Sequence, residues 1–141
     1  MYDLERFVRA QAPVYDTVVK ELGAGRKRSH WMWFIFPQME GLGLSEMAQR
    51  YAIASLDEAA AYLAHPVLGA RLRECAALVL AVPGDSADAV FGHPDNMKFY
   101  SSMTLFAAVP GADPVFAKNL DKYFRGAPDS LTLARLKEQR I

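Results

Sequence analysis

The sequence predicts an all-α fold, a single compact domain of several helices over residues 1–141. Two observations carry this prediction. Apolar residues recur at helical spacing along most of the chain, and proline, glycine and capping residues separate the periodic segments. The alternation of apolar and polar residues that is typical of half-buried strands is nearly absent. One short apolar run, residues 31–36, suits either a strand or a buried helical turn, and both remain open.

The first half of the chain predicts four helices. Residues 3–22 form two of them, divided at Pro13, because proline fits the first turn of a helix and interrupts its interior. Ser55 and Glu58 have the spacing of a capping box, which predicts a helix that ends near Ala64. Pro66 opens the next helix, whose apolar stripe consists of Leu68, Leu72, Cys75, Val79 and Val82.

The second half predicts four more helices. A short one covers residues 86–91 and a longer one residues 95–109. Asp113 and Pro114 are a start signal for the third, which Gly126 ends. Asp129 is the expected cap of the last helix.

Composition excludes several classes of function. Sixteen Lys and Arg balance sixteen Asp and Glu, so no long-range field attracts polyanions and a nucleic-acid partner is not expected. The single cysteine, Cys75, lies on an apolar stripe and is expected to be inert packing. The three histidines lack metal-ligand spacing, and no cofactor motif is present, so we expect neither a metal site nor a cofactor. Without a signal peptide or a membrane-length apolar run, we expect a cytoplasmic protein with no membrane partner.

Residues 26–38 are the least ordinary segment of the chain. Arg26, Lys27 and Arg28 lead into an aromatic run that contains both tryptophans, Trp31 and Trp33. Cations beside aromatic faces suit a phosphate together with a flat ring. Alternatively, the aromatic residues are core and the cations a solvated loop. Two further polar residues of this segment are candidates, His30 as an acid/base group and Gln38 as a ligand-binding residue.

Residues 92–106 are the second unusual segment. On a helix, Asp95, Lys98 and Ser102 lie on one face, with Ser101 beside them. They could face a pocket in which Asp95 or Lys98 acts on a substrate. Equally, Asp95 could be an N-cap paired with Lys98, and the hydroxyl could bond back to the helix. We predict that His30, Lys98 and Ser102 approach a common cavity.

These two segments also carry a resemblance. The run Trp-Met-Trp-Phe-Ile-Phe-Pro-Gln at 31–38, with residues 65–72 and 95–106, resembles the bacterial domain-of-unknown-function family 1810, sometimes labelled "calpastatin". The resemblance covers nearly the whole chain and implies a helical single domain with no established activity. Lys98-Phe99 and Leu105-Phe106 are more weakly similar to the NADAR proteins, helical domains linked to NAD and ADP-ribose metabolism. The glutamate-led motif of that family has no counterpart here.

Two hypotheses follow. The first is an enzyme or binder for a small anionic, ring-bearing ligand, such as a nucleotide or an ADP-ribose-like molecule. Its catalytic candidates are Asp95, Lys98 and His30, and its ligand-binding candidates are Lys27, Arg28, Trp31, Trp33, Gln38, Ser101 and Ser102. The second is a non-catalytic protein-interaction domain that exposes the aromatic run. The sequence leaves open whether the protein is an enzyme, and also its oligomeric state.

Overall fold

Helices dominate the structure, a computed structural model that describes residues 2–138. Ten helices in this part of the chain account for 62% of the protein, so the all-α prediction is confirmed. They are α1 (Glu5–Gln11), α2 (Tyr15–Gly23), α3 (Met32–Ile35), α4 (Glu46–Arg50), α5 (Leu56–Ala64), α6 (Leu68–Ala81), α7 (Ala87–Phe91), α8 (Asp95–Ala107), α9 (Val115–Phe124) and α10 (Ser130–Glu138). The predicted limits at residues 1 and 141 lie outside the described residues.

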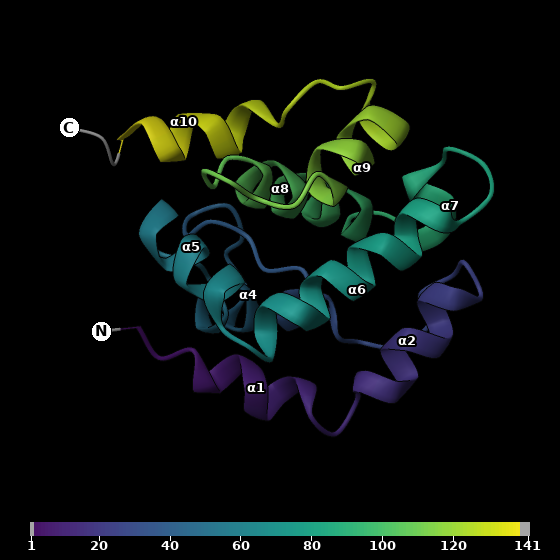
Figure 1. Ribbon diagram of the computed structural model, residues 1–141, viewed down its shortest axis with the longest axis horizontal. Coiled ribbons are helices and arrows are strands. Elements are labelled where there is room, and N and C mark those ends of the chain that lie inside the picture. The colour runs from purple at the N-terminus through teal and green to yellow at the C-terminus, as the bar shows by residue number, and fades with distance from the viewer. Residues whose placement is uncertain (1, 139–141) are drawn as a thin grey trace.

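Helix α8 lies at the centre of the fold. It packs against α5, α7, α9 and α10, and Figure 1 shows it between α6 and α10. Its residues from Phe99 to Phe106 are buried except for Tyr100, as expected of a helix that other helices surround. Its first turn, with Asp95 and Lys98, is only half-buried. This arrangement places polar side chains at the surface on a rigid, well-packed element.

Aromatic packing connects α8 to the run at residues 31–36. The Phe36 and Phe99 rings meet edge to face at 5.0 Å, and the Phe91 and Phe99 rings stack at 4.6 Å. Such pairs stabilise a core beyond their buried area. The run itself forms the short helix α3, which decides between the two alternatives in favour of a helical turn. In residues 2–138 the β-structure consists of one isolated parallel bridge between Met39 and Ile53.

Most of the local start and stop signals act as predicted. The Ser55 hydroxyl caps α5 by accepting from the Glu58 N–H at 3.1 Å, but the Glu58 carboxylate accepts from the Ala54 N–H at 2.7 Å instead of completing the box at Ser55. Asp129 caps α10 by accepting from the Thr132 N–H at 3.3 Å. Helix α4 was not predicted, although Ser45 caps it in the same way.

The environment of Cys75 and the length of the helices bear on two possibilities, a reactive thiol and a membrane-spanning segment. Cys75 is fully buried, and this burial raises the pKa of its thiol to about 12, so the thiol is inert packing as expected. Of the helices in residues 2–138, none combines the length and apolar character needed to cross a bilayer.

Candidate functional site

A buried carboxylate holds the cationic loop that precedes the aromatic run. Glu21 of α2 accepts from the Arg28 N–H at 2.7 Å, the Ser29 N–H at 3.0 Å and the Trp31 indole N–H at 2.9 Å, and also from the Ser29 hydroxyl. Burial works to raise the pKa of Glu21, but these hydrogen bonds outweigh it and lower the pKa to about 2. The loop is therefore fixed from within and is not a freely solvated segment.

Fixing this loop brings Lys27 to the first turn of α8, far away in the sequence. The Lys27 ammonium lies 2.8 Å from Asp95 Oδ2, and the Lys98 ammonium lies 3.2 Å from Asp95 Oδ1. We call these three residues the Asp95 cluster. Burial works to raise the pKa of Asp95, while the hydrogen bonds and charges of Lys27 and Lys98 outweigh it and lower the pKa. Two cations on one carboxylate leave the cluster with a net positive charge.

The cluster corrects the expectation that Asp95 is an N-cap. Asp95 is the first residue of α8, Pro94 occupies the cap position, and no side chain caps the helix there. The predicted i,i+3 pair with Lys98 is present. Periodicity gave no indication of the shorter contact with Lys27, because Lys27 lies on another segment of the chain.

The two tryptophans have different environments. Trp31 is 1% exposed, and its ring lies 5.2 Å from the Lys27 ammonium, so it is core and offers no free face for stacking. Trp33 is half-buried, and its ring lies 5.2 Å from the Lys98 ammonium. The burial of Trp31 argues against its predicted binding role, whereas Trp33 keeps a partly accessible ring beside a cation.

A cleft of about 310 Å³ opens beside Lys98. Its polar lining comes from Gln38, Lys98, Ser101 and Asp129, and its apolar lining from Leu42, Gly43, Pro94, Met97 and Leu131. Three residues selected from the sequence, Gln38, Lys98 and Ser101, thus meet in one cavity. A cavity near 300 Å³ is at the lower limit for small-molecule sites, which combine apolar walls with a few convergent polar groups.

Ser101 and Ser102 have contrasting roles. The Ser101 hydroxyl lies 3.1 Å from the Met97 carbonyl and 3.0 Å from Asp129 Oδ2. Its single proton is therefore shared between its own helix and the carboxylate that caps α10. Ser102 is fully enclosed, and its hydroxyl has no hydrogen-bond partner among the described residues. Ser102 neither lines the cleft nor bonds back to its helix, so both expectations for it are wrong.

The remaining candidates lie outside the cleft. His30 and Arg28 are exposed and do not line it, so His30, Lys98 and Ser102 do not share this cavity. Lys27 has an 8% exposed side chain and serves to hold Asp95. An acid/base role for His30 and a binding role for Arg28 stay predictions from the sequence.

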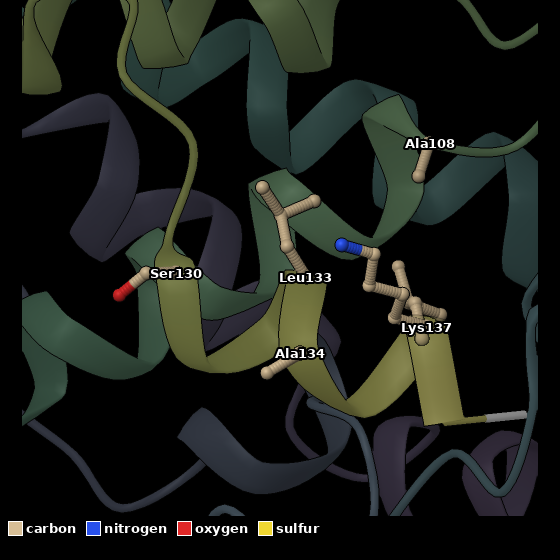
Figure 2. Close-up of a pocket in the computed structure, with 6 residues that line it drawn as sticks. Ala108, Ser130, Leu133, Ala134 and Lys137 are labelled. Atoms are coloured by element: carbon tan, nitrogen blue, oxygen red, sulfur yellow. The ribbon is translucent and has the colours of Figure 1, made fainter.

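A larger cavity of about 480 Å³ lies between α10 and the end of α8. Figure 2 shows Leu133, Ala134 and Lys137 projecting from α10, with Ala108 at the end of α8. Its polar side chains, Ser130 and Lys137, are both exposed. The cavity lacks the converging buried polar groups that distinguish a binding site from a surface hollow, so the smaller cleft is the better candidate.

Sequence reasoning missed two residues that matter here. Glu21 gave no signal, because a glutamate inside an amphipathic helix is ordinary. Asp129 was identified as a helix cap, and its presence in the cleft lining depends on how α10 packs against α8.

Taken together, the fold and the site define a small helical domain with a polar cleft at the first turns of its central helix. The chain belongs to the family described as Protein of unknown function (DUF1810), whose model matches residues 1–136. It is similar to the conserved hypothetical protein Rv1873 from Mycobacterium tuberculosis, whose crystal structure is known. The two share 57% sequence identity over 96% of this chain and 97% of the other, with a TM-score of 0.94. No curated protein matches the chain.

Proposed function

We propose that the protein binds a small anionic, ring-bearing ligand in the cleft beside Lys98, of the nucleotide or ADP-ribose-like class. The observation that carries the proposal is the convergence of Gln38 with Lys98 and Ser101, from two segments far apart in the sequence, in one cavity. The similarity to the NADAR proteins, which rests on residues of α8, favours the same class of ligand.

The Asp95 cluster supplies the positive charge that such a ligand needs. Lys27 is nearly enclosed and makes the shorter contact with Asp95, so its charge balances that of the carboxylate and the charge of Lys98 is in excess. The Lys98 side chain is 23% exposed and uses one of its three donors on Asp95. Its remaining donors and its charge are available to an anion at the cleft, where partial burial weakens screening by salt.

The surroundings of Lys98 suit a flat, partly apolar group. Leu42, Met97 and Leu131 form apolar walls of the cleft. The half-buried Trp33 is not part of the cleft lining, but its ring lies 5.2 Å from the ammonium of Lys98. Because the cleft holds only about 310 Å³, we expect it to take one portion of a dinucleotide-sized molecule, such as a nucleoside monophosphate.

The alternative, an interaction domain that exposes its aromatic run, loses its support. Trp31, Phe34 and Phe36 are all buried, and only Trp33 is partly accessible. A binding module would present these side chains as a surface patch.

The proposal is tested by titrating the protein with AMP and measuring affinity by calorimetry. We expect Lys98→Met to weaken binding about ten- to a hundredfold, the effect of losing one charged hydrogen bond. Lys118→Met is the matched control, because Lys118 is exposed on α9 and does not line the cleft. Binding of AMP to Lys98→Met with the affinity of the unmodified protein would overturn the proposal.

A further inference from the structure

The cleft contains a second polar anchor, the carboxylate of Asp129. Asp129 is 7% exposed and lines the cleft directly before α10. Its Oδ2 atom lies near three donors: the Ser101 hydroxyl at 3.0 Å, the Thr132 N–H at 3.3 Å and the Thr132 hydroxyl at 2.6 Å. One oxygen of this carboxylate thus carries the whole helix cap.

The other oxygen, Oδ1, is different. The hydrogen bonds to this carboxylate within residues 2–138 all end on Oδ2. Oδ1 is not among the polar atoms that the protein encloses without a partner, so it keeps some accessible surface, on a residue that lines the cleft. A carboxylate has about four acceptor positions, so an accessible Oδ1 can accept a hydrogen bond from a ligand. The helix cap accounts for Oδ2 but gives no reason for a free Oδ1.

We propose that Asp129 Oδ1 accepts a hydrogen bond from a hydroxyl group of the ligand, so that the cleft selects sugar phosphates and nucleoside phosphates over simple anions. This inference rests on the proposed function, because it requires the anionic part of the ligand to lie at Lys98. A carboxylate that binds a ribose hydroxyl is a recurrent device in nucleotide recognition.

The geometry of α8 supports a ligand with two such groups. Lys98 and Ser101 lie three residues apart on this helix, about 4.5 Å along its axis, and Ser101 is hydrogen-bonded to Asp129. Lys98, Ser101 and Asp129 therefore line the same cleft, with the cation and the carboxylate contributed by different segments. The negative charge of Asp129 also opposes a second anionic group at its end of the cleft, which favours a neutral hydroxyl there.

Two probes of similar charge test this inference on the whole protein. Ribose 5-phosphate carries hydroxyl groups, whereas methyl phosphate carries the phosphate group alone. We expect nuclear magnetic resonance titration to show ribose 5-phosphate binding about tenfold more tightly than methyl phosphate. Equal affinities would overturn the role of Asp129 and leave the anion site intact. If neither probe binds, both the inference and the proposed function fail.

Variants separate the ligand contact from the helix cap. Asn is as good an N-cap as Asp, so Asp129→Asn keeps an oxygen for Thr132 while its amide replaces the free acceptor. We expect this variant to bind both probes equally. Thr132→Val is the matched control. It removes the hydrogen bond from the Thr132 hydroxyl to the same carboxylate, and Thr132 does not line the cleft. This variant should still prefer ribose 5-phosphate to methyl phosphate. A preference that persists in Asp129→Asn would refute the proposal. Should that variant fail to fold, the two probes on the unmodified protein still decide.

Discussion

The Glu21 carboxylate provides a test of how the loop that carries Lys27 is held. Glu21 is 9% exposed and accepts hydrogen bonds from Arg28, Ser29 and Trp31. Two substitutions separate its charge from its shape. Glu21→Gln keeps an oxygen for the three N–H donors, and its amide can donate to the Ser29 hydroxyl. Glu21→Ala removes every acceptor and leaves the indole N–H of Trp31 enclosed and unpaired.

The expected magnitudes follow from the pKa and from the hydrogen bonds. A fall in pKa from 4.5 to about 2 corresponds to at most about 3 kcal/mol of folding free energy at neutral pH, since a tenfold change in proton affinity is worth about 1.4 kcal/mol. We therefore expect Glu21→Gln to cost about 2–3 kcal/mol. An enclosed donor without a partner adds about 1–3 kcal/mol, so Glu21→Ala should cost about 3–6 kcal/mol.

The pH dependence gives an independent check, with a definite sign. The pKa is lower in the folded than in the unfolded protein, so the contribution of Glu21 is fully present above about pH 4.5 and is lost as the pH falls towards 2. At pH 3 about 60% of it should be gone. The stability difference between the unmodified protein and Glu21→Gln should therefore shrink between pH 7 and pH 3.

Urea unfolding followed by circular dichroism at both pH values measures these differences. Glu46→Gln is the control, because this carboxylate is 86% exposed and forms a surface pair with Arg50, so its loss should change stability by less than about 0.5 kcal/mol. The reasoning would be refuted by a Glu21→Gln protein as stable as the unmodified one at pH 7. It would also be refuted by a stability difference that is the same at pH 7 and pH 3.

Two further predictions concern packing and charge. Asp95→Ala should lower the free energy of unfolding by about 3 kcal/mol, more than a lost helix cap, because it leaves the nearly enclosed Lys27 without its partner. In thermal unfolding, the double variant with Lys27→Met should recover part of that stability. No recovery would contradict the interpretation that Lys27 and Asp95 form a buried pair. Gly69→Ala should cost about 3 kcal/mol, because a Cβ there would lie 2.1 Å from the Leu63 carbonyl oxygen. A Cβ added at Gly23 would meet no neighbouring atom within 4 Å, so Gly23→Ala should instead stabilise the protein by about 0.4–1 kcal/mol. Equal melting temperatures for Gly69→Ala and Gly23→Ala would show that the cost expected for Gly69→Ala is wrong.

Much of the fold was predictable because helix boundaries are set locally. The break at Pro13, the Ser55 cap and the Asp129 cap each depend on residues within one turn, and each has its predicted effect in the structure. The short helix α4 was missed because its five residues are too few to establish a period. Local signals can identify helices, but they do not state which helix faces which.

The candidate site was predictable in its parts and not in its assembly. Unusual composition selected Gln38, Lys98 and Ser101, which the structure brings to one cleft. The same reasoning also selected Trp31 and Ser102, which are enclosed in the core. Residue type alone cannot distinguish these cases, because the sequence does not show whether a tryptophan is buried in the core or lies beside a ligand.

The sequence by itself determined the all-helical architecture, the order of most helices and the two segments richest in polar and aromatic groups. Tertiary structure alone decided that Glu21 fixes the cationic loop, that Lys27 pairs with Asp95, and that Asp129 lines the cleft. The physical reason is the range of the interactions. Capping and periodicity act within a few residues, whereas the Lys27–Asp95 pair and the cleft lining join segments that become neighbours only when α8 packs into the centre of the domain.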